Sequence, residues 1–325
     1  MYEFQTVWGW QPALYLFLGG LGAGAFAVAA LAYLKDRDAA HRKAASIVSW
    51  IATGCLAVGL LLLLTELAAP LRAFAMWQSF GHGSSWMAIG AWLLALAMVV
   101  FVLAGASLTD PLLARMDKKL PKVANFLRKA CVPLLIAGTV LGVCVAAYTG
   151  VLLMSADGVA LWNTPLLPCL FTASAIGTGL ALYELVAFAL AKRCSATAAE
   201  DETPGSGHKR DYIQIAVVVF AVLEACFLAA FTLVALNADG AANVSAQALV
   251  SGQYALPFWG LVVLCALAVP LICATTHVVA GKLPAVLSVL APLCALAGGC
   301  ALRFVIVFAG AHADPVYSAI LSIFS

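Results

Sequence analysis

Charged residues are scarce in this sequence of 325 residues, which contains only 10% Asp, Glu, Lys and Arg and 64% hydrophobic residues. A soluble domain carries about 25% charged residues, and a water-soluble globule of this length cannot enclose so much apolar surface. The composition therefore excludes a soluble enzyme, and it also excludes intrinsic disorder. The remaining class is a protein that crosses a membrane several times. The net charge of +2 gives no indication of a nucleic-acid partner.

Residue pairs that bind metals or haem are also missing. None of the 10 cysteines forms a CxxC pair, and cysteines within apolar stretches usually behave as small hydrophobic residues. A transmembrane b-type haem needs histidines that face each other inside helices. The 5 histidines all fall in predicted loops or at helix ends: His41, His82, His208, His277 and His312. We therefore expect no haem, iron–sulfur cluster or other metal site in this protein.

No Walker-type phosphate loop is present. The segment GGLGAGAF at 19–26 superficially resembles a dinucleotide fingerprint, but it lies inside an apolar run and follows no strand. The spacing of Gly20 and Gly24 instead predicts a small-residue face for close packing of helices.

Apolar runs of about 20 residues, long enough to cross the hydrocarbon core, occur along the whole sequence. They are continuously apolar rather than alternating, which favours helices over barrel strands. The first run has no positive flank and is long enough to span, so it is not a cleaved signal peptide. We predict an all-α polytopic membrane protein, a single domain over 1–325, with eight transmembrane helices in a bundle at 13–34, 44–67, 86–108, 131–154, 166–190, 213–236, 255–275 and 285–311.

The basic residues predict how these helices are oriented. Of the 17 Lys and Arg residues, all except Arg72 and Arg303 fall in loops that follow odd-numbered helices. The positive-inside rule places those loops in the cytoplasm and therefore both termini outside. One of these cytoplasmic loops, at about 191–212 between the fifth and sixth helices, is polar and linker-like. The opposite loops are rich in aromatic, Pro, Gly and small polar residues, as expected of a structured cap or docking surface.

Four ionisable residues fall within the predicted helices or at their ends. At 1.5 Å per residue, their depths below the outer edge are about 2 Å for Glu66, 12 Å for Arg303, 18 Å for Glu224 and 27 Å for Glu184. Charges at such depths are expensive and indicate function or pairing. Two interpretations remain open: a proton route, and a structural ion pair of Arg303 with Glu224 or Glu66.

Several segments together resemble one family of membrane subunits. They are WQPALYLFLGGLGAGAF at 10–26, YTGVLL at 148–153, LWNTPLLPCLFTASAIGTG at 161–179 and GGCALRFVIVFAG at 298–310. In combination they are similar to the NrfD/PsrC family of polysulfide-reductase-type subunits, over nearly the whole sequence. One segment departs from the family pattern: TELAAPLRAF at 65–74 has Ala68 and Ala69 where the family commonly has Gly-Arg.

The resemblance implies a quinone-binding membrane anchor that exchanges electrons between the membrane quinone pool and a partner subunit on the outer face. The quinone would be menaquinone or a related quinone. The expected partners are a ferredoxin-like four-cluster iron–sulfur subunit and, beyond it, a molybdopterin oxidoreductase or a multihaem cytochrome. The expected location is the bacterial or archaeal cytoplasmic membrane, with the partner face periplasmic or extracellular. A protein without redox centres can transfer electrons only by placing an organic carrier beside another subunit's cofactor.

A few polar and aromatic residues near the outer ends of the helices could contact a quinone head group. Tyr148 lies about 9 Å below the outer edge, and the resemblance implies a tyrosine near the quinone ring in the fourth helix. Gln11 could donate to a quinone carbonyl, and Glu66 and His82 could accept quinol protons. Trp162 and Asn163 lie in a matching segment and could orient the ring.

Each of these residues also has a structural interpretation, as an interfacial aromatic residue, a helix cap or a solvated loop residue. Arg72 and Trp77, in the loop after the second helix, are the candidates for contacts with a partner subunit.

The alternative interpretation is a secondary transporter or a proton-conducting protein in which Glu184, Glu224 and Arg303 line the path. Transporters often contain inverted repeats and helices broken at the midplane. Pro270 falls late in the seventh run and Pro292 interrupts the eighth, but neither has a counterpart in the other half of the sequence. No internal repeat is apparent, so the sequence favours the redox interpretation.

Overall fold

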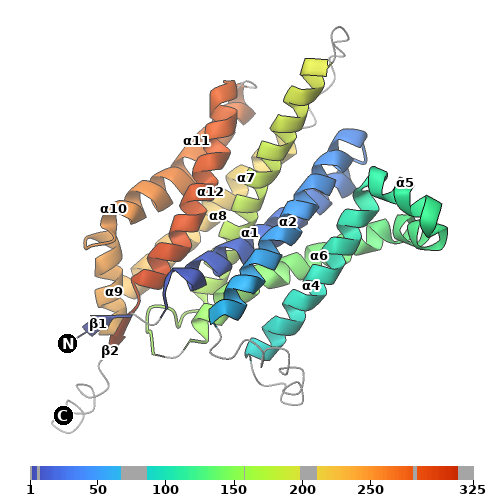
Figure 1. Cartoon of the computed structure of the whole chain (residues 1–325). Helices are drawn as coiled ribbons and strands as arrows, with labels where there is room; N and C mark the ends of the chain where they lie inside the picture. Colours follow the sequence, from blue (N-terminus) through green and yellow to red (C-terminus); the bar gives the residue numbers. More distant parts are fainter. Residues whose placement is uncertain are drawn as a thin grey trace, which may run out of the picture.

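The computed structural model describes residues 2–5, 8–66, 86–156, 158–197, 211–280 and 284–313. Within these ranges eight helices are long and apolar enough to cross a membrane, which confirms the predicted all-α polytopic membrane fold (Figure 1). The spans are α1 (Trp10–Lys35), α2 (Ala39–Glu66), α4 (Trp86–Leu108), α6 (Pro121–Met154), α7 (Leu166–Thr197), α8 (Asp211–Leu236), the composite of α10 (Ala255–Pro257), η2 (Phe258–Ala268) and α11 (Val269–Ala280), and α12 (Ala285–Phe308).

Short elements lie at the two ends of the bundle, and the sequence did not predict them. Strand β1 (Tyr2–Phe4) pairs antiparallel with β2 (Ala311–Ala313), and α9 (Ala241–Val250) packs beside both. We call this the strand end. Helix α5 (Asp110–Lys119) lies at the opposite end, near the turn between α1 and α2 (Figure 1). We call that the basic end, because the basic residues of the turn between α1 and α2 and of α5 lie there.

Helix α1 is the centre of the bundle. In its most apolar window 72% of the residues are buried, against 28–44% in the other spans. It packs against α2, α6, α7 and α12. Gly and Ala make up most of its middle, and such small residues let neighbouring helices come close enough for extensive van der Waals contact in a membrane.

Glycine makes the crossing of α1 and α7 possible. A Cβ built on Gly24 would lie 2.0 Å from the carbonyl oxygen of Ala175, and one on Gly179 would lie 2.4 Å from the carbonyl carbon of Gly24. Neither position has room for a methyl group. The predicted small-residue face is therefore confirmed at Gly24, whereas Gly20 faces Ala175 and the guanidinium group of Arg303.

The seventh span is a π-helix over Phe258–Ala268. At its end the N–H of Val269 donates to the carbonyl of Leu264, five residues back. Pro270 follows and has no N–H to donate, so one backbone hydrogen bond of the helix is missing at this point. Segments of π-helix occur frequently at functional sites, and Pro270 lines the large cavity described below.

The Gly24→Ala variant is expected to lower the melting temperature and purified yield of the protein, because overpacking a tight contact typically costs about 1–3 kcal/mol. The measurement is a thermal unfolding curve in detergent. The matched control is Gly54→Ala on α2, where a Cβ would have no neighbour within 4 Å and alanine gains about 1 kcal/mol of helix propensity over glycine. Equal melting temperatures for the two variants would contradict the close crossing.

Candidate functional site

Three of the residues expected to contact a quinone head group lie on helices that meet at the strand end. Gln11 is the second residue of α1 and Glu66 is the last residue of α2. Tyr148 lies in α6, about 9 Å before that helix ends. Since α1 packs against both α2 and α6, these three positions belong to neighbouring helices at one end of the bundle.

Tyr148 is half-buried between α6 and α4. A Cβ built on Gly90 would lie 1.8 Å from the ring Cζ and 1.9 Å from the hydroxyl oxygen, so the end of the ring rests on the backbone of α4. Ile89 and Trp92, which lie close to Gly90 in the sequence, are 44% and 58% exposed. The hydroxyl group therefore lies close to the apolar outer surface of the bundle, from which a lipophilic molecule would approach.

Trp162 has a different environment from Tyr148. Its side chain is fully buried, and its indole N–H donates to the carbonyl of Ile306 at 3.0 Å. Its ring also meets that of Trp8 edge-on, with the centroids 5.4 Å apart. Trp162 therefore fixes the connection between α6 and α7 against α12, and its indole donor is engaged. Asn163, the next residue, is exposed.

The remaining predicted residues of this end lie outside the described part of the protein. They are His82, Arg72 and Trp77, all between α2 and α4.

Gln5 is a structural residue that the sequence analysis missed. Its amide nitrogen donates to the carbonyls of Trp8 and Val307, and its amide oxygen accepts from the N–H of Trp8. Together with the pairing of β1 and β2, these bonds hold the segment before α1 against the end of α12. The result is an ordered cap at the strand end, formed by β1, β2 and α9.

A second polar cluster lies in the interior of the bundle, where Ser174 of α7 links Arg303 of α12 to Glu224 of α8. The guanidinium Nη1 of Arg303 donates to the Ser174 hydroxyl, and the Glu224 carboxylate lies close to that hydroxyl. Arg303 is fully buried and Glu224 is 5% exposed. No direct ion pair joins the two charges within the described residues, so the predicted ion pair of Arg303 with Glu224 is not found there, and Ser174 stands between the two side chains.

Backbone groups and an aromatic ring complete the environment of Arg303. Nη2 donates to the carbonyl of Phe171 at 3.1 Å, and the guanidinium carbon lies 4.8 Å from the centroid of the Phe171 ring. Nη1 also donates to the carbonyl of Gly299. Nη2 also lies beside Gly20 of α1, where an added Cβ would be 3.4 Å from it. A buried arginine needs such partners, because an isolated charge at the bilayer centre costs at least about 2.5–3.5 kcal/mol.

A cavity of about 710 Å³ extends from the basic end to Glu224. Its lining at the basic end includes His41 of α2, Arg193 of α7 and His277 of α11. Deeper in the bundle it is lined by Glu184 and Glu224. Glu184 and Glu224 therefore line the same cavity. They are two of the four ionisable residues that the sequence places at different depths in the membrane.

Polar groups and helix irregularities both shape this cavity. The amide of Gln214 on α8 donates to the Glu184 carboxylate, which gives that carboxylate a partner inside the bundle. Pro270 and Pro292, the two prolines that interrupt the last two spans, line the wall formed by those spans.

Sequence comparisons find a family model and named relatives that match nearly the full length of the protein. A family model described as "Polysulphide reductase, NrfD" matches residues 2–313. Protein NrfD of Escherichia coli (strain K12) is 31% identical over 321 residues, which span 95% of this protein and 96% of that one. The C component of polysulfide reductase from Wolinella succinogenes is 32% identical over 320 residues, with 95% and 96% coverage. A protein NrfD homolog of Haemophilus influenzae is 26% identical over 278 residues, with 82% and 83% coverage.

The bridging role of Ser174 predicts that Ser174→Ala destabilises the protein. The change removes one hydrogen-bond acceptor of the buried Arg303 guanidinium group, at a cost of about 1–3 kcal/mol. The measurement is the melting temperature in detergent. The matched control is Ser107→Ala, because the Ser107 hydroxyl is buried but bonds the carbonyl of Ala104 in its own helix. A loss no larger for Ser174→Ala than for Ser107→Ala would refute the bridge.

Proposed function

The protein belongs to the NrfD polysulphide reductase family, and from this premise we propose that it carries the quinone-binding site of an oxidoreductase complex. As an integral membrane protein of this family it is a membrane subunit of a redox complex. Its specific role in the proposal is to exchange electrons between the quinone pool and an iron–sulfur partner. The family assignment favours this redox role over secondary transport.

The observation that carries the proposal is the extent of the family match. It runs from residue 2 to residue 313 and therefore includes the helices that present Gln11, Glu66 and Tyr148 at the strand end. One relative of similar extent is named as a component of polysulfide reductase. A membrane protein with this relationship is expected to work with further subunits that hold the redox cofactors.

The position of Tyr148 suits a lipophilic substrate. A quinone is dissolved in the bilayer, and its ring oxygens need polar partners when the ring leaves the lipid. The Tyr148 hydroxyl lies beside Gly90 near the apolar outer surface, and Gln11 lies nearer the strand end on the adjacent helix α1. In the proposal, Tyr148 and Gln11 bind the two ends of the ring, and Glu66 and His82 accept the protons released on quinol oxidation.

The strand end is the proposed docking face for the partner. The cap made by β1, β2 and α9 gives this end an ordered surface, which suits a permanent subunit contact. The partner is proposed to be a ferredoxin-like four-cluster iron–sulfur subunit, joined to a molybdopterin oxidoreductase or a multihaem cytochrome. Arg72 and Trp77 are proposed contacts, and Ala68 and Ala69 remove one basic contact that the family commonly has.

The orientation follows from the charge distribution. The basic loops are proposed to face the cytoplasm, so the strand end and its partner face the periplasm or the cell exterior. The quinone site then lies near the outer surface of the cytoplasmic membrane.

Tyr148→Phe is expected to leave assembly unchanged and to slow electron exchange with a quinol analogue by roughly 5- to 150-fold. The lost hydroxyl leaves a quinone oxygen unpaired, at a cost of about 1–3 kcal/mol. The assay is quinol oxidation by the purified complex. The control is Tyr212→Phe, which removes a hydroxyl near His41 at the basic end. Unchanged activity in Tyr148→Phe, with activity abolished by Gln11→Ala or Glu66→Gln, would place the site elsewhere at the strand end.

The cavity supports a second role, the movement of protons between the basic end and Glu224. It connects that end with two carboxylates, Glu184 and Glu224, and is lined by His41 and His277 near its opening. Carboxylates and histidines in such a path are the groups that relay protons in membrane proteins. In this proposal the protons that accompany quinone chemistry are exchanged partly through the cavity, which would couple electron transfer to charge movement.

Glu224→Gln separates the relay role from a purely structural one. The amide can still accept a hydrogen bond from Ser174 but cannot bind and release a proton. We expect the complex to assemble in normal amounts and to release fewer protons per quinol oxidised. The measurements are the yield of the assembled complex and the proton release of proteoliposomes. Asp117→Asn, outside the cavity lining, is the control. Unchanged turnover and proton stoichiometry would exclude the relay.

A further inference from the structure

A second pocket, separate from both sites above, lies at the basic end. It has a volume of about 390 Å³ and lies between the turn joining α1 and α2, the corner between α4 and α5, and the start of α6. Its principal lining residues are Tyr33, Arg37, Arg42, Asp110, Arg128 and Cys131. Three arginines thus converge on one small space.

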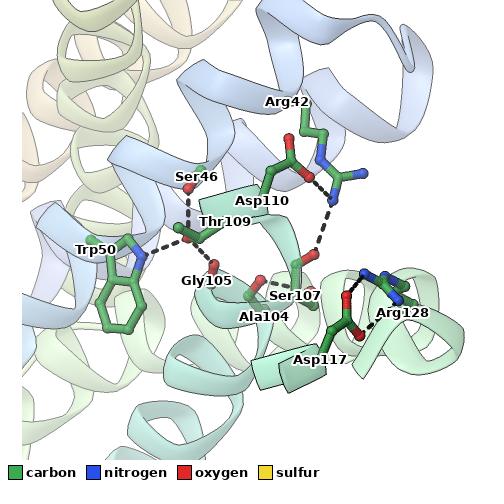
Figure 2. A network of polar contacts seen from close by, with 10 residues as sticks. All are labelled: Arg42, Ser46, Trp50, Ala104, Gly105, Ser107, Thr109, Asp110, Asp117 and Arg128. Atoms are coloured by element: carbon green, nitrogen blue, oxygen red, sulfur yellow. Dashed lines mark hydrogen bonds and ion pairs between the residues drawn. The ribbon is translucent and has the colours of Figure 1, made fainter. Parts of the chain in front are cut away.

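Two of the arginines of this pocket are held in place by acidic partners. Nη2 of Arg42 contacts Asp110 at 2.8 Å and donates to the carbonyl of Ser107 at 3.3 Å. Arg128 makes a two-pronged contact with Asp117 (Figure 2). These pairs fix the two guanidinium groups and also neutralise them.

The pocket keeps a positive charge and free donor capacity. Within the described residues no ion pair is found for Arg37, so its charge is not matched by a carboxylate there. The buried Nε of Arg42 has no acceptor in the same part of the protein. An anion with several acceptor oxygens would balance the charge of Arg37 and accept a hydrogen bond from the Nε of Arg42.

Three residues along one face of α2 support placing this pocket at the level of the membrane surface. Arg42, Ser46 and Trp50 are spaced four residues apart and therefore share one face of the helix. Ser46 contacts the Thr109 hydroxyl at 2.8 Å, and the indole N–H of Trp50 donates to it at 3.0 Å (Figure 2). Trp50 is 40% exposed, and tryptophan is enriched at the boundary between lipid and water.

The start of α6 supports the same assignment. Val123 and Phe126, just before Arg128, are 42% and 64% exposed, and the nearby basic residues Lys118, Lys119 and Lys122 are exposed as well. Exposed apolar side chains beside basic ones are typical of helices that lie in the interface.

We propose that this pocket binds the phosphate group of an anionic phospholipid, such as phosphatidylglycerol. Basic pockets between transmembrane helices recognise anionic headgroups, and guanidinium groups match phosphate oxygens geometrically. Arg37 supplies the unmatched charge, Arg42 and Arg128 supply oriented donors, and the Tyr33 hydroxyl adds another. The acyl chains lie along the exposed apolar side chains of α2 below Arg42, which include Ile47 and Trp50. The lipid thereby links α1, α2 and α6 through its headgroup.

The test compares lipids on the purified full-length protein, by native mass spectrometry and by the shift in melting temperature. Phosphatidylglycerol is expected to bind and stabilise more than phosphatidylcholine. Arg37→Gln is the main variant, because it breaks no ion pair among the described residues. Loss of one interfacial charge is expected to weaken phosphatidylglycerol binding about fivefold. Arg115→Gln on α5 is the matched control, since Arg115 is exposed and does not line the pocket.

A second variant tests the same pocket independently, in case Arg37→Gln impairs folding. Arg42→Gln combined with Asp110→Asn removes both partners of one ion pair together, and it too is expected to weaken phosphatidylglycerol binding while Arg115→Gln does not.

Three results would overturn the proposal. Equal stabilisation by phosphatidylcholine would show ordinary solvation by lipid. Equal weakening in Arg115→Gln would show diffuse surface attraction. An equal shift produced by inorganic phosphate, with displacement of the lipid, would assign the pocket to a free anion.

Discussion

The crossing of α1 and α7 brings two backbones into direct contact at Gly24 and Gly179, and the polar interior depends on that contact. Ser174 directly precedes Ala175, whose carbonyl meets Gly24, and Gly20 lies about one turn from Gly24 on α1. Because α7 is held so close, the Ser174 hydroxyl and the Phe171 carbonyl reach Arg303. Without α7 so close, the guanidinium group would lose these two partners and keep the carbonyl of Gly299 in its own helix. The close packing of α1 and α7 therefore also brings the partners that compensate the charge of Arg303 within its reach.

The arrangement separates two kinds of chemistry along the membrane normal. At the strand end, Gln11 and Tyr148 lie on packed helices near the lipid surface, where the proposed quinone head group would be held. From the basic end, the cavity reaches Glu224, which is joined through Ser174 to Arg303. The proposal places an electron-transfer site and a proton-accessible interior within one bundle, as coupling between the two would require. The π-helix of the seventh span and its following proline border that interior.

The basic end has its own polar organisation, independent of quinone binding. Ion pairs of Arg42 and Arg128 set the shape of a pocket whose remaining charge comes from Arg37. A phospholipid there would connect the helices α1, α2 and α6, which also present the proposed quinone site at the other end. The lipid headgroup would then stabilise the packing of α1 by electrostatic attraction, and the crossing with α7 stabilises the same helix by van der Waals contact.

The sequence by itself determined the class of the protein, the number of spans and the family resemblance. Long continuous apolar runs can be satisfied only by spanning helices, and the segments around Tyr148 and Arg303 resembled one family. The spacing of Gly20 and Gly24 also indicated close packing. Each of these conclusions depends on residues that are near one another in the sequence. The quinone-site residues remain predictions.

Only the tertiary structure decided which distant residues meet. Depth along a helix placed Arg303 near Glu224, but the rotation of each helix about its axis determined that Ser174 would stand between them. Trp162 matched a family segment, yet its contact with Ile306 depends on the fold of the connection between α6 and α7. The pairing of β1 with β2, the cavity and the arginine pocket likewise join elements that are distant in the sequence. Periodicity and hydropathy describe one helix at a time, and they carry no information about these pairings.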